Sequence, residues 1–542
     1  MLKKLKTNFK KLNIETFLIA LILIIVPTYY LISGLTLTKF PVANVDEGWQ
    51  WNNALLFSDK NFSSVNLHFF GHGEGLPFVL DFLLGIIGNF AGVGLFQGRL
   101  LILIISFATL ILLFSLTKKL YDAKTALLAV IFLILTDTFL SGSRLIRTDL
   151  IMGAFLLIWA LFFFSFAKTN KLLPLILASA TLSFGFEVHQ NNALFYLGSL
   201  FTLTILPTKT LQKKIYLLAL YILGPLIYGV YYLTAHILPN VSSFAALYRY
   251  GIFIDHPLPI FSMSPVQMVV AEINRYTNYF FGGRFFEFSI ILPGFLLVLF
   301  NKKYKQSFLG LFVFFSALMF LLFSASKLDH YFVTFYLIFA IFAAKFLSLV
   351  LFGTWPKLKN LQQNFKNSDF NISFQLKTTK KFRETAYLIL VATIILLTGL
   401  NIFRIAIRFK NFSEYNLQSL GKKIETSIPK ESKIMGPPYW FMVLPEHRFV
   451  SFYTLTWYRV LEGKQLLTAF EEIASEYLIV DKTVRDNFVN DKKLLKNTNF
   501  QEGLYYIYKP EIETMLQNYG KRIVSFDDEF LGPVEIYKLN FK

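Results

Sequence analysis

The chain has 542 residues, of which 55% are hydrophobic and 16% charged, and it contains no Cys. Soluble domains carry about 25% charged residues, so this composition excludes an ordinary soluble enzyme and indicates a multi-pass membrane protein. The missing Cys excludes disulfides and thiolate metal sites. Because Lys and Arg collect in cytoplasmic loops, topology explains the formal net charge of +19 better than nucleic-acid binding, and we expect no nucleic-acid partner.

Apolar stretches near the length of a membrane span predict an all-α membrane domain with about eleven transmembrane helices. The stretches lie at about residues 16–36, 98–117, 124–141, 150–167, 172–188, 193–207, 214–235, 287–301, 306–325, 331–352 and 385–406. This domain is expected to occupy residues 1–407.

The stretch 76–94 is ambiguous, because it contains Asp81, Asn89 and four glycines within an apolar run. It could span the membrane, re-enter it or lie in the interface, and the positive-inside rule arbitrates. If it does not cross, the basic loops all face the cytoplasm together with the N-terminus. These loops are 118–124, 168–171, 207–214, 301–305 and the linker 353–384. We therefore predict an in-plane or re-entrant helix at 76–94.

The extracytoplasmic face then receives the first external loop, 37–96, and the long external loop, 236–286. Apolar residues at helical spacing within 266–280 predict an amphipathic helix on the outer leaflet, in contact with membrane lipids.

From about residue 408 short β-rich runs alternate with helical ones, which predicts a small extracytoplasmic α/β domain over 408–542. Strands are expected at 432–436, 448–452, 476–480, 504–509, 522–526 and 534–539. Helices are expected at 414–427, 464–475 and 511–519.

Asp46 and Glu47 follow the first span by about ten residues and are flanked by Trp49 and Trp51. A carboxylate that is partly shielded from water at the membrane interface can act as a general base. The alternative interpretation is a solvated acidic pair between interfacial Trp anchors.

The segment SRLIRTD (143–149) places Arg144, Arg147 and Asp149 at the outer end of a predicted span. If this segment is helical, the two arginines share a face, where they could grip a phosphate or pyrophosphate. The alternative is a snorkelling pair that anchors the helix end.

Three further groups end up on the same side of the membrane. Lys327 and His330 occupy a short external turn, where Lys327 could pair with a phosphate. His189 lies at another outer helix end, where it could bond a sugar or serve the structure. His68, His72 and Glu74 have a spacing that could hold a divalent metal ion if the stretch were helical, although the glycines between them oppose a helix.

Together these elements resemble the integral-membrane glycosyltransferases of the GT-C fold. Members that the chain resembles are the protein O-mannosyltransferases and the bacterial transferases that move aminoarabinose or other sugars from a polyprenyl-phosphate carrier. The resemblance covers about residues 15–350 and is carried by four segments. They are VDEGWQWNNALLF (45–57), GEGLPFVLDFLLGIIGNFAGVGLFQGRLL (73–101), SGSRLIRTDLIMGAFLL (141–157) and FSASKLDHYFVTFYLIFA (323–340).

The resemblance implies transfer of a sugar from a polyprenyl phosphate, expected to be of the undecaprenyl type, to a hydroxyl of a protein, lipid or polysaccharide. The reaction would take place on the extracytoplasmic face with inversion at the anomeric carbon. Asp46 would be the general base, and Glu47 would position a substrate. The donor phosphate would be bound by Arg144, Arg147 or Lys327. The expected substrate-binding residues are Asp149, His189, His330 and Tyr331, and dependence on a divalent metal is left open.

Two other classes of function remain as alternatives, namely a transporter or flippase for a lipid-linked sugar and a non-catalytic glycan-binding membrane protein. Transporters more often carry charges in mid-span and show two halves with paired broken helices. Here the charges cluster at outer helix ends, which favours the transferase.

Overall fold

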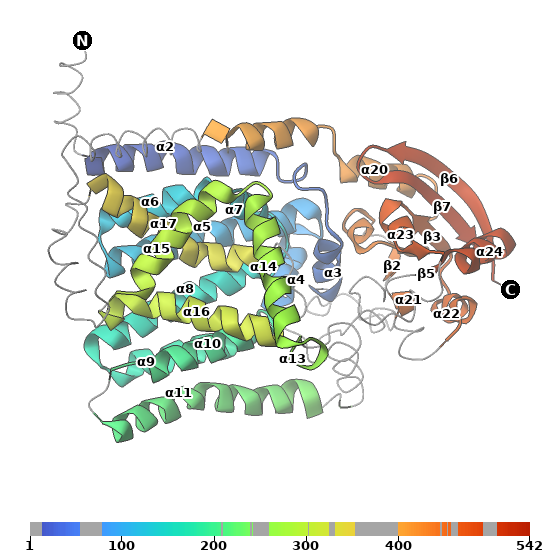
Figure 1. Cartoon of the computed structure of the whole chain (residues 1–542). Helices are drawn as coiled ribbons and strands as arrows, with labels where there is room; N and C mark the ends of the chain where they lie inside the picture. Colours follow the sequence, from blue (N-terminus) through green and yellow to red (C-terminus); the bar gives the residue numbers. More distant parts are fainter. Residues whose placement is uncertain are drawn as a thin grey trace, which may run out of the picture.

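The computed structural model describes residues 14–54, 79–207, 210–238, 241, 259–301, 303–324, 331–352, 399–400, 402–444, 447–452, 454–456, 464–490 and 507–541. These residues form a bundle of helices, and a small sheet domain lies against one end of the bundle, beside helix α3 (Figure 1). The predicted fold class is therefore confirmed.

The described residues contain six helices that are long and apolar enough to cross a membrane. Helices α14 and α15 form a pair with a bend of 119° between them, and this pair raises the number to seven if it counts as one span. The helices concerned are α2 (Ile14–Leu35), α5 (Leu95–Leu120), α8 (Asp149–Thr169), α11 (Leu211–Tyr232) with its extension η4 (Leu233–Ile237), α16 (Tyr304–Phe323), α17 (Phe332–Phe352), and the pair α14 (Pro265–Phe281) and α15 (Phe285–Leu299). The chain is a multi-pass membrane protein, and the expected total of about eleven spans stays a prediction.

Shorter helices complete the bundle. They are α4 (Val79–Ala91), α6 (Ala123–Ile134), α7 (Asp137–Gly142), α9 (Leu172–Phe184) with η3 (Gly185–Glu187), α10 (Asn192–Thr204) and α13 (Pro259–Ser262). Helix α4 falls within the ambiguous stretch 76–94, and its placement relative to the membrane stays a prediction. Helix α14 confirms the helix expected at 266–280, and Ser264 forms a capping box with Gln267 at its start.

The centre of the bundle is formed by α8 and α17, which are the most buried of the long helices, whereas α2 and α11 lie at its periphery (Figure 1). Trp159 on α8 is fully buried and packs against Phe312 of α16, with ring centroids 4.2 Å apart. Gly153 lets α8 approach Leu337 of α17 so closely that a Cβ atom would lie 2.3 Å from that side chain.

The C-terminal region contains a five-stranded sheet with the order β2-β1-β3-β7-β6. Its strands are β1 (Lys433–Gly436), β2 (Arg448–Ser451), β3 (Tyr477–Val480), β6 (Gly520–Asp528) and β7 (Gly532–Leu539), and β4 (Phe488–Val489) pairs separately with β5 (Ile507–Tyr508). Strands β1, β2 and β3 are parallel, whereas β7 is antiparallel to β3 and β6.

Helices α20 (Leu417–Glu425), α22 (Leu466–Ile473) and α24 (Lys509–Tyr519) accompany the sheet, together with the short α21 (Thr454–Thr456), α23 (Lys482–Asp486) and η8 (Pro438–Val443). The alternation of strands and helices expected from the sequence is confirmed, and β5 begins within its expected run 504–509.

Helix α3 (Val45–Ala54) joins the two parts of the molecule, because it packs on the bundle and on η8 of the C-terminal region. A Cβ atom on Gly48 would lie 2.1 Å from the backbone oxygen of Pro438. Just before the helix, the N–H of Ala43 donates to the hydroxyl of Tyr415 at 3.1 Å. The position of α3 therefore depends on a close backbone contact that only glycine permits.

We predict that Gly48→Ala destabilises the protein by about 1–3 kcal/mol, because the added methyl group overpacks against rigid backbone. Thermal unfolding in detergent measures the effect. Gly229→Ala on α11 is the matched control, since a Cβ there meets nothing within 4 Å. Equal melting temperatures for the two variants would contradict the packing described for α3.

Candidate active site

The N-terminus of α3 is capped by residues of the motif NVDE (44–47). The side-chain oxygen of Asn44 accepts the N–H of Asp46 at 2.9 Å, and Glu47 Oε2 accepts the N–H of Asn44 at 2.9 Å. Asn44 thus caps the helix through the N–H at its second position, and Glu47 at the third position supplies the return bond that is typical of a capping box. The cap fixes Asp46 in the first helical turn, where the helix dipole stabilises a negative charge.

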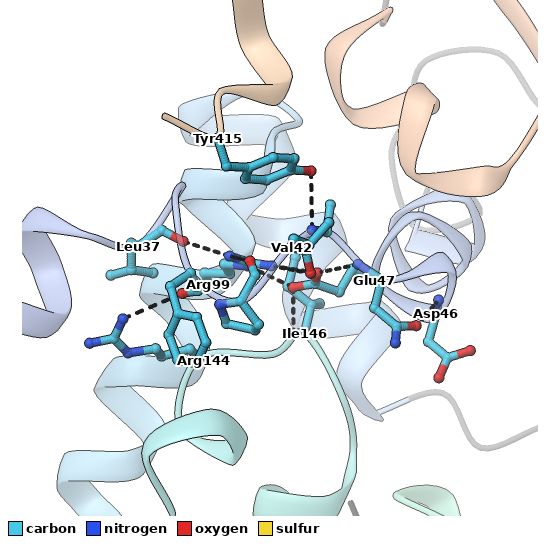
Figure 2. Close-up of polar contacts among 12 residues, drawn as sticks. Leu37, Val42, Asp46, Glu47, Arg99, Arg144, Ile146 and Tyr415 are labelled. Carbon is cyan, nitrogen blue, oxygen red and sulfur yellow. Dashed lines mark hydrogen bonds and ion pairs between the residues drawn. The ribbon is translucent and has the colours of Figure 1, made fainter. Parts of the chain in front are cut away.

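Glu47 is fully buried and points into the protein (Figure 2). Its carboxylate forms a bidentate pair with Arg99, with N–O distances of 2.8 and 2.7 Å. Glu47 Oε1 also accepts the backbone N–H of Ile146 at 3.1 Å. Both oxygens of the Glu47 carboxylate thus accept hydrogen bonds from within the protein. In this arrangement Glu47 holds α3 against Arg99 and Ile146.

Arg99 is the fifth residue of α5 and is also fully buried. Besides Glu47, its guanidinium donates to the carbonyl oxygens of Leu37 and Pro41 at 2.7 and 2.8 Å (Figure 2). Arg99 is not among the site residues predicted from the sequence. The available signal was a single arginine at the start of a long apolar helix, because a buried cation requires a partner.

Asp46 points the other way and forms an ion pair with Arg147. The Arg147 Nε atom also lies 2.8 Å from Asp149 Oδ2, so the guanidinium bridges two carboxylates. The Asp46 side chain is 38% exposed, whereas those of Arg147 and Asp149 are 12% and 4% exposed. The structure thus brings together three predicted site residues, with Asp46 as the accessible member.

Arg144 does not join this group. Residues 143–148 form a turn between α7 and α8, so the expectation that Arg144 and Arg147 share a helix face is wrong. Arg144 is fully buried and donates to Ser33 Oγ at 2.8 Å and Thr36 Oγ1 at 3.0 Å. Figure 2 shows Arg144 and Asp46 on opposite sides of the Glu47–Arg99 pair. Arg144 is therefore a structural contact of α2.

His189 and Tyr331 lie next to the bridging arginine. The Arg147 guanidinium is 6.0 Å from the centroid of the Tyr331 ring, and the His189 and Tyr331 rings meet edge-to-face at 5.5 Å. Burial lowers the pKa of His189 to about 4, with Asp149 opposing and Arg147 reinforcing the shift. His189 Nδ1 accepts the N–H of Asn191 at 3.0 Å, which leaves Nε2 as the donor of the neutral ring.

The remaining predicted site residues lie outside the described part of the chain. They are the phosphate candidate Lys327, the substrate candidate His330 and the metal candidates His68, His72 and Glu74. Their roles stay predictions.

Part of the chain matches a known protein family. Residues 76–232 match the family model described as dolichyl-phosphate-mannose-protein mannosyltransferase. The matched segment contains Arg99, Arg147 and Asp149. No curated protein sequence matches the chain.

Solved structures resemble nearly the whole chain. The crystal structure of ArnT from Cupriavidus metallidurans bound to undecaprenyl phosphate has a TM-score of 0.58 at 12% identity, over 95% of this chain and 98% of that chain. ArnT from the same organism in the apo state gives 0.58 at 11% identity, with the same coverage. This chain has the GT-C fold. The oligosaccharyltransferase of Archaeoglobus fulgidus in the apo form has a lower TM-score of 0.45 at 12% identity, over 95% of this chain and 74% of that chain.

Within this GT-C fold, the site combines an accessible carboxylate, a guanidinium beside it and a neutral imidazole that can donate a hydrogen bond. A carboxylate can accept a proton from a hydroxyl, and a guanidinium can stabilise charge that develops on a phosphate oxygen. These groups suit a group transfer between a hydroxyl and a phosphate ester.

We predict that Glu47→Gln destabilises this GT-C protein by about 3–5 kcal/mol, because it leaves the Arg99 cation buried without its counter-charge. The loss is measured as thermal unfolding in detergent. The control is Glu513→Gln, which breaks an exposed pair with Lys509 (3.7 Å) and should change stability by less than about 1 kcal/mol.

The paired replacement of Glu47 and Arg99 by Met should recover part of the loss, since it removes both buried charges together. A single Glu47→Gln variant as stable as the exposed control would contradict the account of this pair.

We also predict that acidification from pH 7 to pH 5 destabilises the wild type more than His189→Gln. The folded pKa of about 4 lies below the ordinary His value of 6.5, so between these values the unfolded chain binds the additional proton. The contribution to stability is therefore complete above pH 6.5 and is lost as the pH falls toward 4. Melting temperatures of both proteins across this range test the difference, and parallel curves would refute it.

Proposed function

We propose that this protein is a polyprenyl-phosphate-dependent glycosyltransferase that transfers a sugar to a hydroxyl acceptor with inversion, with Asp46 as the general base. The observation that carries the proposal is the accessible carboxylate of Asp46 beside Arg147, on a fold shared with ArnT. The ArnT structure that contains undecaprenyl phosphate supports a lipid-linked donor of this type.

In the proposed reaction the acceptor hydroxyl gives its proton to the Asp46 carboxylate while its oxygen attacks the anomeric carbon of the donor sugar. The bond between that carbon and the phosphate oxygen breaks, and its electron pair leaves with the polyprenyl phosphate. Attack from the face opposite the leaving group inverts the anomeric carbon. The protein binds both substrates and balances the charge that moves from the base to the leaving phosphate.

Arg147 is assigned the role of stabilising the leaving phosphate. In the structure this guanidinium is shared between Asp46 and Asp149, which keeps it close to the base and ready for a third anionic partner. Asp149 orients Arg147, and the neutral His189 donates a hydrogen bond to a substrate oxygen. Lys327 is assigned the second cation.

Two residues receive different roles from those first expected. Glu47 positions α3 through Arg99 instead of touching a substrate, because both of its oxygens are occupied. Arg144 is not assigned to the donor phosphate, because its guanidinium is buried against α2.

The proposed topology places the N-terminus in the cytoplasm and the C-terminal domain outside the cell membrane. The α7–α8 turn, the η3–α10 turn and the start of α17 contribute Arg147, His189 and Tyr331 to one cluster. Their gathering at a single end of the bundle supports a reaction at one membrane face, which the basic loops identify as the extracytoplasmic one.

We predict that Asp46→Asn lowers the rate of sugar transfer by about 10²–10⁴-fold while binding of polyprenyl phosphate is retained, because the variant removes only the proton acceptor. Transfer from undecaprenyl-phosphate-linked hexoses and pentoses is measured with purified protein, and lipid binding by native mass spectrometry. Asp527→Asn on the exposed surface of β6 is the matched control and should leave the rate unchanged.

Full transfer activity in Asp46→Asn would refute the assignment of the base. Movement of the intact lipid-linked sugar across a vesicle membrane, unaffected by Asp46→Asn and without any transfer, would instead identify a flippase.

A further inference from the structure

Four buried polar atoms on α3 and α4 lack a hydrogen-bond partner in the structure. One is the indole Nε1 of Trp51, whose ring packs against Gly88 and Gly98 inside the bundle. The other three are the indole Nε1 of Trp49, the amide oxygen of Asn53 and Oδ1 of Asp81. The side chains of Asn53 and Asp81 are 2% and 5% exposed. Native proteins keep few such atoms, and each one calls for an explanation such as a bound ligand or ordered water.

The groups of Trp49, Asn53 and Asp81 lie on the same side of α3 as the proposed base. Asp46, Trp49 and Asn53 are spaced i, i+3 and i+7, so their side chains share one face of α3. With a rise of 1.5 Å per residue, Asn53 lies about 10 Å along the helix axis from Asp46. Asp81 in the first turn of α4 adds to this surface, because its carboxyl hydrogen-bonds the side chain of Asn53.

The other two faces of α3 are already occupied. Glu47 and Trp51 face the bundle, where the Trp51 ring packs so closely on Gly88 of α4 that a Cβ atom there would lie 3.2 Å from the ring. Gly48 faces the backbone of Pro438 in the C-terminal region. Only the face that carries Asp46, Trp49 and Asn53 combines an accessible carboxylate with unsatisfied polar atoms.

The chemistry of these atoms selects the ligand. The Trp49 indole can only donate, whereas Asn53 Oδ1 accepts, and the Asp81 carboxyl accepts when ionised or also donates when protonated. A phosphate ligand is excluded, because its oxygens would face the oxygens of Asn53 and Asp81 with no cation among these groups to balance its charge. A ring with neighbouring hydroxyl groups meets both needs, since each hydroxyl donates and accepts, and the Trp49 indole offers an apolar surface to the ring.

We propose that Trp49, Asn53 and Asp81 form a sugar-binding subsite beside Asp46, in which they bond the hydroxyl groups of a glycosyl ring. The proposal rests on the proposed function, because it names the part of the active site that reads the sugar. The ring belongs either to the lipid-linked donor or to a glycosylated acceptor, and the same hydroxyl chemistry serves both.

The test uses the full-length protein, Asp81→Leu and Asn53→Ala, with the lipid-phosphate hexose or pentose that the wild type transfers. Loss of hydrogen bonds to the sugar should raise one KM by about tenfold and leave kcat less affected. The KM of the donor rises if the donor sugar occupies the subsite, and the KM of the acceptor rises if a glycosyl acceptor does. Asn89→Leu, on the exposed side of the same helix α4, is the matched control and should leave both KM values unchanged.

Monodeoxy analogues of the sugar separate a binding role from a structural one. The analogue that lacks the hydroxyl bonded by Asp81 should show the same KM in the wild type and in Asp81→Leu. If Asp81→Leu does not fold, Asp81→Asn keeps the shape of the side chain and is tested in the same way.

Two results would overturn the proposal, and they are distinguishable. In the first result the wild type transfers a sugar, and both variants keep the wild-type KM values and have a raised melting temperature. The three atoms are then unsatisfied buried polar groups without a ligand, and only the subsite is refuted. If the wild type transfers no sugar from any polyprenyl phosphate, the proposed function and the subsite fall together.

Discussion

The buried pair of Glu47 and Arg99 is the interaction on which the candidate active site depends. Arg99, near the start of α5, donates to carbonyl oxygens of the turn that follows α2. Glu47, in the first turn of α3, accepts the N–H of Ile146. The two residues next to these anchored positions are Asp46 and Arg147, which form the accessible ion pair. One buried contact thus fixes both partners of the site through their neighbours in the chain.

Burial of this ion pair carries a large desolvation free energy, because both charged groups lose their contacts with water. A well-packed apolar pair would be about as stable, so stability alone does not account for the arrangement. What the charged pair adds is directional geometry, since a bidentate guanidinium–carboxylate contact admits few orientations. A site that must hold a base at a defined position beside a cation benefits from this directionality more than from extra stability.

Much of the fold was predictable, because hydropathy and periodicity are local properties. Within the described residues the long apolar runs form helices, and the β-rich runs after residue 408 form strands, five of them in one sheet and β5 in a separate pair with β4. The strand order and the mixed directions of the sheet could not be predicted, since they depend on contacts between distant segments. The grouping of Asp46, Arg147 and Asp149 followed from placing charged loops on one side of the membrane.

The finer assignments within the site failed where they assumed local structure. Helical spacing predicted that Arg144 and Arg147 act together. Because residues 143–148 form a turn, Arg144 instead contacts α2, and Arg147 pairs with Asp46. Arg99 was missed because its partner is 52 residues away in the sequence. A short motif identifies which residue types are present, whereas the fold decides which of them face a substrate.

The three faces of α3 show how one short helix combines these requirements. One face anchors the helix to Arg99, a second contacts the C-terminal region at Gly48, and the third carries Asp46. A helix of ten residues is too short to be stable alone in water, so its tertiary contacts must hold it in place. The C-terminal region is therefore part of the support for α3, because the face that carries Asp46 keeps its orientation only while the other two faces remain packed.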